Sequence, residues 1–168
     1  MTIANGSGPA SGPALSAEAA ALYSPLALAY LGDAVFELCV RIHMMELGQL
    51  PVVELNRRAK ALVNAQAQSR MYFALLDKVE ETEADILRRG RNAKAPTKAR
   101  HASITAYRHA TGVEALFGYL KLTGQEERLR YVFQLCLDAA ESGETDESDE
   151  TAAASCPKEP AADSLPEK

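Results

Sequence analysis

Apolar residues recur at helical spacing through most of the chain, and this pattern constrains the fold more than any other feature of the sequence. The segment between Ser24 and Gly48 shows the pattern best. Ser24-Pro25 is typical of a helix N-terminus, because serine caps a helix and proline suits its first turn. Gly48 is typical of a helix end. The apolar face predicted for this helix consists of Leu28, Leu31, Val35, Leu38 and Ile42.

Cap and turn residues divide the rest of the folded part into further helices. The predicted starts are Pro51, Asn64, a Thr82-x-x-Asp85 capping box, about residue 102, Thr111 or Gly112, and the segment after Gly124. Gly90 is predicted to end the helix that begins at the capping box. Strand signals are nearly absent, so we expect an all-α, single-domain bundle with short connections.

Composition predicts one folded domain between two disordered segments. Residues 1–15 are rich in Gly, Ser, Pro and Ala, and residues 141–168 carry nine acidic and two basic residues. We expect both segments to be disordered, because neither can bury enough apolar surface to offset the entropy of ordering. The folded domain is predicted over 16–140. Residues 1–140 hold 16 basic and 14 acidic residues, a balance that is compatible with nucleic-acid binding without requiring it.

The cysteines and the apolar runs bear on the cellular compartment. Cys39, Cys136 and Cys156 are far apart in the sequence, and none has the spacing of a metal site, so we expect reduced thiols. The N-terminus lacks the basic and apolar segments of a signal peptide. No apolar run approaches the ~20 residues of a membrane helix. These features predict a soluble cytoplasmic protein with no membrane association.

Gly32-Asp33 interrupts the apolar run LALAYLGDAVFELCV. Glycine inside a helix costs about 1 kcal/mol relative to alanine, so its presence indicates that another backbone approaches closely. Asp33 lies off the predicted apolar face, and Glu37 and Arg41 follow it at intervals of one turn. Two interpretations stay open: either Asp33 is a functional carboxylate, or the three residues form an exposed stripe with an ordinary Glu37–Arg41 ion pair.

Glu114 is the second candidate carboxylate. Thr111-Gly112-Val113-Glu114 also fits a capping box, in which Glu114 would only bond the backbone N–H of Thr111. Gly118, one turn later, leaves room on the same side of the helix. Two carboxylates from different helices can meet across a bundle and bind a hard divalent cation, which activates water and stabilises charge on a phosphate. The spacing alone leaves open whether Asp33 and Glu114 meet.

Basic residues cluster between positions 88 and 101, with no acidic residue among them. They are Arg88, Arg89, Arg91, Lys94, Lys98, Arg100 and His101. This cluster predicts either phosphate contacts with a nucleic-acid duplex or a solvated basic loop at a helix end. A smaller cluster, Arg57, Arg58 and Lys60, is more typical of an exposed helix face. The histidines form no metal-binding or catalytic spacing, and we expect them to be ordinary.

Three segments resemble the ribonuclease III family, in the order in which that family has them. LAYLGDAVFE resembles the signature helix of the catalytic domain. RRGRNAK at 88–94 and YRHATGVEALFGYLKLTG at 107–124 are similar to Mini-ribonuclease III in particular, and ALVNAQAQ at 61–68 also fits. The resemblance runs from about Pro25 to Arg130.

The resemblance implies a helical endonuclease fold and a homodimer in which each subunit cuts one strand of double-stranded RNA. It implies Mg²⁺ as cofactor and a large-subunit ribosomal RNA precursor as substrate. Asp33 stands at the position of the family's catalytic aspartate, and Glu114 at that of its metal-binding glutamate. Two further family carboxylates are missing, at Ala29 and Thr111. No separate double-stranded-RNA-binding domain fits in the chain, so RNA contacts are expected from the catalytic domain itself. Those contacts are assigned to Arg88, Arg89, Arg91, Lys94, Lys98 and Arg100.

Two rival functions stay open. The first is a non-catalytic helical RNA-binding or assembly module on the same scaffold, motivated by the two missing carboxylates. The second is a metal-dependent nucleotide phosphohydrolase, although the chain lacks the histidine–aspartate pairs that such helical enzymes usually show. The presence of Asp33 and Glu114, each with a small residue near it, favours the nuclease.

Overall fold

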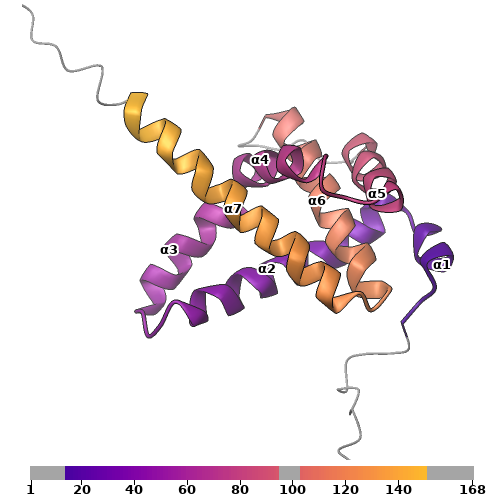
Figure 1. The fold of residues 1–168 in the computed structure, drawn as a ribbon, viewed down its shortest axis with the longest axis horizontal. Coiled ribbons are helices and arrows are strands. Elements are labelled where there is room, and N and C mark those ends of the chain that lie inside the picture. The colour runs from indigo at the N-terminus through magenta and orange to yellow at the C-terminus, as the bar shows by residue number, and fades with distance from the viewer. Residues whose placement is uncertain (1–13, 95–102, 151–168) are drawn as a thin grey trace, which may run out of the picture.

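The computed structural model of the protein describes residues 14–94 and 103–150, and these residues form a bundle of helices (Figure 1). No strand occurs in this part of the chain, so the predicted all-α fold is confirmed. The helices are α1 (Ala17–Ala21), α2 (Pro25–Glu46), α3 (Val52–Val63), α4 (Ala65–Leu75), α5 (Glu81–Asn92), α6 (Ile104–Leu122) and α7 (Glu126–Glu150).

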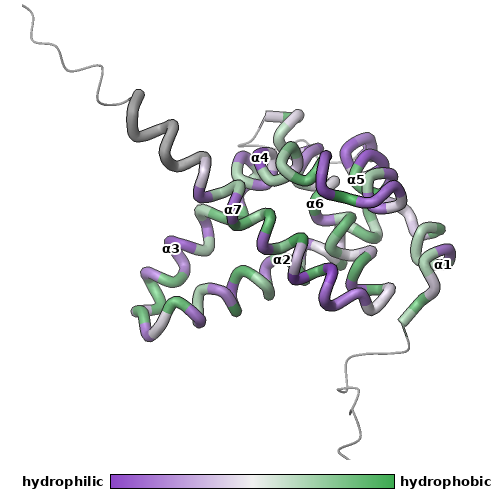
Figure 2. The backbone as a smooth tube through the Cα atoms, viewed as in Figure 1, coloured by the Kyte–Doolittle hydropathy of each residue, from purple (hydrophilic) through white to green (hydrophobic). Residues whose placement is uncertain are grey.

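Helix α6 is the centre of the bundle. It packs against α1, α2, α4, α5 and α7, and most of its residues from Ala106 to Leu120 are buried. Hydrophobic residues accordingly follow α6 through the molecule, whereas α5 is largely hydrophilic (Figure 2). A polar side chain on α6 is therefore brought into the interior, where its charge must be accommodated by neighbouring helices.

Several predicted helix starts are confirmed by their caps. The Ser24 hydroxyl accepts a hydrogen bond from the N–H of Ala27 at 3.1 Å, and Pro25 is the first residue of α2. The side chain of Asn64 accepts one from the N–H of Ala67 at 2.9 Å, at the start of α4. In each case the side chain satisfies a donor that the first helical turn leaves without a partner.

The bounds predicted for α5 are wrong. Its capping box is formed by Glu80 and Glu83, whose carboxylate accepts from the backbone N–H of Glu80 at 2.9 Å, and not by Thr82 and Asp85. The helix continues past Gly90, because this glycine packs against α6: a Cβ there would lie 2.7 Å from the Cα of Gly112. The glycine is thus a close contact between helices rather than a helix end.

The two helices predicted over about 102–110 and from Thr111 onward are one continuous helix, α6. The Thr111 hydroxyl donates to the carbonyl of Tyr107 at 3.0 Å and does not cap a new helix. Gly112 faces α5, since a Cβ there would lie 2.8 Å from the carbonyl oxygen of Leu87. Tertiary packing explains this Thr-Gly pair, which in the sequence has the form of a helix boundary.

The apolar face predicted for α2 is only partly correct. Leu28 is buried, but Leu38 and Ile42 are 57% and 51% exposed. The buried stripe advances by four residues at each step and consists of Leu28, Gly32, Phe36, Val40 and Met44. It runs along the contact of α2 with α6, and the ring of Phe36 meets that of Phe117 edge to face at 5.1 Å. Gly32 therefore lies in the middle of the interface.

The structure also describes residues near the predicted domain ends. The backbone N–H of Leu15 donates to the carbonyl of Leu122 at 2.8 Å, and α1 follows it. At the other end α7 continues to Glu150, beyond the predicted boundary at 140. Residues 1–13 and 151–168, which make up most of the segments predicted to be disordered (1–15 and 141–168), lie outside the described residues, and the domain division stays a prediction. In the part of the chain that the structure describes, no helix is long and apolar enough to cross a membrane.

Candidate active site

Two glycines bring α2 and α6 into direct backbone contact. A Cβ on Gly32 would lie 1.6 Å from the carbonyl oxygen of Glu114, and a Cβ on Gly118 would lie 2.0 Å from that of Leu28. No side chain fits in either place, so only glycine permits this crossing. The close approach predicted at Gly32 is therefore confirmed. Asp33 follows Gly32 directly, and the crossing places it beside the turn of α6 that carries Glu114.

The two candidate carboxylates influence each other's ionisation. Glu114 is mostly buried, and burial, followed by the negative charge of Asp33, raises its pKa to about 7. The pKa of Asp33 is also raised, first by partial burial and then by the charge of Glu37. The structure thus brings Asp33 and Glu114 together. Among the described residues no positive charge lowers either pKa: the one opposing contribution is the neutral side chain of Gln68 on Glu114.

Gln68 is a part of this site that the sequence did not reveal. It comes from α4, its side chain is 2% exposed, and it hydrogen-bonds the side chain of Glu114, which opposes the rise in the pKa of that carboxyl. In the sequence it stands in the polar stretch AQAQSR, where nothing distinguishes it from a solvent-facing residue. Its burial follows from the packing of α4 against α6.

The donor set of the site is small and fits a hard cation. No cluster of three or more His, Cys, Asp or Glu side chains that could hold a metal ion occurs among the side chains described, those of residues 14–94 and 103–142. Asp33 and Glu114 are called the acid pair from here on. Ala29 and Thr111 are both buried near it, and the Thr111 hydroxyl donates a hydrogen bond to the carbonyl of Tyr107. Two carboxylates whose negative charge is unbalanced suit Mg²⁺, which is commonly held by one or two carboxylates and keeps several waters.

The alternative interpretations of the two acids have different outcomes. The predicted ion pair between Glu37 and Arg41 is confirmed, at 3.3 Å on the exposed side of α2. Asp33 is not part of that pair. The capping-box interpretation of Glu114 is wrong, because the N–H of Thr111 lies inside the continuous helix α6. The catalytic and metal-binding roles of Asp33 and Glu114 stay predictions.

The basic residues at the end of α5 divide into tethered and exposed side chains. Arg88 is ion-paired with Asp85. The guanidinium of Arg89 donates to the carbonyls of Ala21 at 2.8 Å and Tyr23 at 3.1 Å. Arg89 therefore fastens the segment between α1 and α2 to α5, a structural role that is independent of any nucleic acid.

The remaining members of this basic cluster form no ion pair with the described residues or are not described themselves. Arg91 and Lys94 are exposed. Lys98, Arg100 and His101 lie outside the described residues. The assignment of this cluster to RNA contacts stays a prediction.

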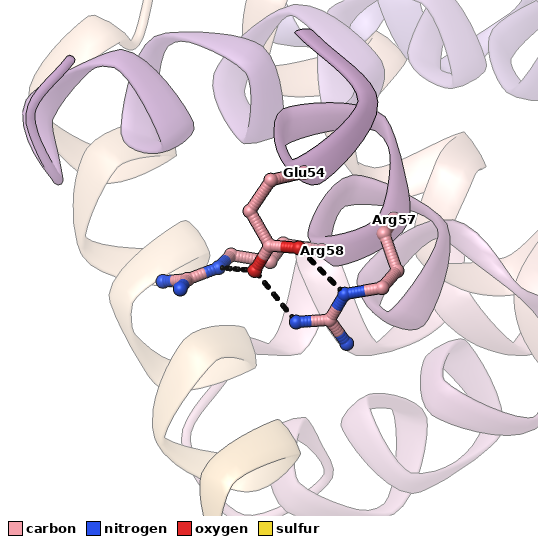
Figure 3. Close-up of polar contacts among 3 residues, drawn as sticks. All are labelled: Glu54, Arg57 and Arg58. Atoms are coloured by element: carbon pink, nitrogen blue, oxygen red, sulfur yellow. Dashed lines mark hydrogen bonds and ion pairs between the residues drawn. The ribbon is translucent and has the colours of Figure 1, made fainter. Parts of the chain in front are cut away.

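The smaller basic cluster is engaged on the surface of α3. Glu54 accepts hydrogen bonds from Arg57 at 2.7 and 2.8 Å and from Arg58 at 2.6 Å (Figure 3). Those hydrogen bonds, from Arg57 first and then Arg58, lower the pKa of Glu54 to about 2. The side chains of Arg57 and Arg58 are 68% and 42% exposed, in keeping with the expected helix face.

Comparison with known proteins shows to which class of protein this chain belongs. Residues 26–125 match the family described as Ribonuclease III domain. The solved structure of protein FN1578 from Fusobacterium nucleatum is similar, with a TM-score of 0.64 and 33% sequence identity over 70% of this chain and 93% of that one. The fold and its central pair of glycines therefore belong to a ribonuclease III domain.

Curated relatives narrow this class. Mini-ribonuclease 3 of Brevibacillus brevis is 43% identical, over 67% of this chain and 84% of that relative. Mini-ribonuclease 3 of Enterococcus faecalis is 44% identical, over 73% of this chain and 92% of that relative. The chain belongs to the Mini-ribonuclease 3 family, and the resemblance seen in the sequence is confirmed.

Proposed function

We propose that this protein is an Mg²⁺-dependent endoribonuclease that hydrolyses phosphodiester bonds of double-stranded RNA. The observation that carries the proposal is the meeting of Asp33 and Glu114 at the Gly32–Gly118 crossing, in a chain of the ribonuclease III family. The unbalanced negative charge at this crossing favours binding of a divalent cation over protonation of Glu114 at neutral pH.

Asp33 and Glu114 would hold the cation, and Gln68 would orient Glu114. When bound, Mg²⁺ activates water and stabilises the negative charge that develops on the phosphate. Gln68 donates a hydrogen bond to the Glu114 carboxylate, which favours its ionised form and restricts its rotation. The glycine crossing keeps the two acids on rigid helices, so their separation depends on backbone packing rather than on loop conformation.

The RNA-binding residues in this proposal are Arg88, Arg91, Lys94, Lys98 and Arg100, with Arg89 beside them. Exposed lysine and arginine side chains at the end of α5 suit phosphate contacts, which supply affinity with little base specificity. We also infer from the family that the enzyme is a homodimer in the cytoplasm, that each subunit cuts one strand, and that the substrate is a large-subunit ribosomal RNA precursor.

The test is cleavage of a long RNA duplex by the purified full chain, with Mg²⁺ and with chelator. Asp33→Asn should abolish cleavage while thermal unfolding shows a folded protein. Glu46→Gln is the matched control, because it neutralises an exposed carboxylate on the same helix and should cut as the wild type does.

The outcomes separate the proposal from its rivals. Cleavage that persists in a folded Asp33→Asn protein excludes this assignment of the site. RNA that the wild type binds without cutting, where a related enzyme cuts it, favours the non-catalytic module. Nucleotide hydrolysis without RNA cleavage favours the phosphohydrolase.

A further inference from the structure

A separate polar cavity lies between the end of α5 and the start of α6. Its volume is about 190 Å³, and we call it the arginine pocket; it is lined by Arg91, Asn92, Thr105, Arg108 and His109. It faces away from the acid pair around α6, since this helix turns Gly112 toward α5 and Gly118 toward α2. Arg108 and Glu114 are six residues apart, about 9 Å along the helix axis.

The arginine pocket carries positive charge that the described residues do not balance. No carboxylate is among its lining residues. Among the side chains described, in residues 14–94 and 103–142, Arg91 hydrogen-bonds the neutral Oδ1 of Asn92, which lies 3.3 Å from two of its guanidinium nitrogens. Arg108 is exposed and has no ion pair with this part of the chain. Two guanidinium groups thus line one small cavity, where a bound anion would offset the repulsion between them.

His109 forms a fixed wall of the pocket. Its Nδ1 lies 2.8 Å from the hydroxyl of Ser69, and its ring stacks on that of Tyr72 at 4.6 Å and meets the edge of Phe73 at 4.8 Å. Burial, and then the charge of Arg91, lower the pKa of His109, so the ring is neutral at pH 7. In the tautomer in which the Ser69 hydroxyl donates to Nδ1, the neutral ring carries its proton on Nε2 and is a hydrogen-bond donor there.

We propose that the arginine pocket binds a phosphate group, supplied by the RNA backbone. Guanidinium groups present paired N–H donors that match phosphate oxygens, and the Thr105 hydroxyl and Asn92 amide add neutral donors. Thr105 is in the first turn of α6, where the helix dipole also favours an anion. The inference rests on the proposed function for the identity of the ligand, because a free or terminal phosphate offers the same chemistry.

Two measurements on the metal-free full chain test the proposal. In the first, inorganic phosphate is titrated against ¹⁵N-labelled protein, and the arginine Nε–H and Thr105 backbone signals are followed. In the second, the affinity for an RNA duplex is measured in chelator across a salt series, so that cleavage plays no part. The variant is Arg108→Gln, and its control is Arg130→Gln, which removes the same charge from an exposed position on α7.

We expect saturable phosphate shifts at Arg91, Thr105 and Arg108 that Arg108→Gln removes and Arg130→Gln leaves. Arg108→Gln should weaken RNA binding about tenfold, as for the loss of a charged hydrogen bond. The slope of log affinity against log salt should become shallower by about 1. Together these results support the pocket with the RNA backbone as its ligand.

Other outcomes are equally definite. Phosphate shifts with unchanged RNA affinity contradict the RNA backbone as the source and assign the pocket to a free or terminal phosphate. No saturable shift, with Arg108→Gln equal to Arg130→Gln in RNA affinity, overturns the pocket. Wild-type protein that binds phosphate here but cuts no RNA under any metal condition overturns the nuclease and leaves the pocket standing.

Discussion

At the residue scale, the acid pair depends on two missing side chains. Gly32 and Gly118 let the backbones of α2 and α6 touch, and the contacts across the crossing depend on this short separation of the two helices. Asp33 and Glu114 are therefore positioned by backbone packing, and their side chains only complete the site. The two carboxylates lie close together because Gly32, beside Asp33, and Gly118, one turn after Glu114, have no side chain to hold the helices apart.

Gly32→Ala should destabilise the fold strongly. The added Cβ would lie 1.6 Å from the backbone oxygen of Glu114, so the helices must separate. Overpacking of this kind costs about 3 kcal/mol, measured as the change in the free energy of unfolding in urea. Ala34→Ser, which adds one atom at an exposed position of α2, should cost about 0.5 kcal/mol. Equal losses in the two variants would contradict the close crossing.

Glu114→Gln should stabilise the metal-free protein at alkaline pH. The folded-state pKa of Glu114 is about 7, against an ordinary 4.5. Between these values the folded chain keeps a proton that the unfolded chain loses, so wild-type stability falls as pH rises through this window. The variant does not titrate there. In chelator we expect it to be of the order of 3 kcal/mol more stable than wild type at pH 8, with the difference shrinking toward pH 4.5.

Urea unfolding at a series of pH values measures this difference. Glu46→Gln, at an exposed position, is the control and should follow the wild type throughout. Addition of Mg²⁺ at pH 8 should stabilise the wild type and not Glu114→Gln, because a ligand that binds only the folded state raises its stability. A wild type as stable as the variant at pH 8 without metal would show that Glu114 is not buried beside another negative charge.

At the element scale, local signals identified most of the helices but not how they face each other. Ser24 and Asn64 predicted two helix starts, because a cap acts within one turn. Thr111-Gly112 has the form of a boundary, yet α6 passes through it, since α5 packs on Gly112. Tertiary packing also explains why Leu38 and Ile42 are exposed. The buried stripe of α2 follows the direction in which α6 crosses it, and the sequence of α2 alone does not specify that direction.

The residues of the candidate site also divide into those that a local sequence signal identifies and those that depend on helix packing. Asp33 and Glu114 could be found because glycine inside a helix is a local anomaly that indicates a close neighbour. Gln68 could not, because its role depends on which face α4 turns toward α6. Short helix α1 carried no apolar repeat long enough to be predicted, although the Ser16 hydroxyl caps it at 3.2 Å.

Arg128→Met should loosen the contact between α5 and α7. Glu83 is 3% exposed, and Arg128 donates to its two oxygens at 2.8 and 2.6 Å. Burial opposes the ionisation of Glu83, but these bonds and the N–H of Glu80 hold its pKa below the ordinary 4.5. Without Arg128 the charge is buried and unpaired, which costs about 3 kcal/mol at neutral pH.

The pH dependence of this loss identifies its cause. A carboxyl with a lowered folded-state pKa contributes stability above its ordinary pKa, and that contribution disappears as pH falls through the folded value. The deficit of Arg128→Met, measured by urea unfolding, should therefore shrink below pH 4.5. The double variant Arg128→Met/Glu83→Leu should recover part of the lost free energy of unfolding at pH 7. Arg41→Met, which breaks the exposed pair with Glu37, should lose less than about 1 kcal/mol.

At the scale of the whole molecule, exposed apolar side chains occur on α2 and at the end of α1. Tyr30 is 85% exposed and precedes Asp33 by one helical turn, and Leu22, which follows α1, is 86% exposed. Large apolar side chains in such positions commonly mark interaction surfaces. The proposed homodimer gives them a partner, a second copy of the chain.

Mixed subunits test whether the two sites act on opposite strands. Each subunit carries its own Asp33 and Glu114, so a dimer with one Asp33→Asn subunit should keep one working site. Wild-type protein re-equilibrated with a large excess of Asp33→Asn subunits should therefore nick one strand of a duplex. Nicks are counted on denaturing gels with both strands end-labelled, against double cuts on native gels. An equal excess of Glu46→Gln subunits should leave double cuts predominant. A ratio of nicks to double cuts that does not respond to the Asp33→Asn excess would mean that each chain cuts independently, and the dimer would then have no part in pairing the two cuts.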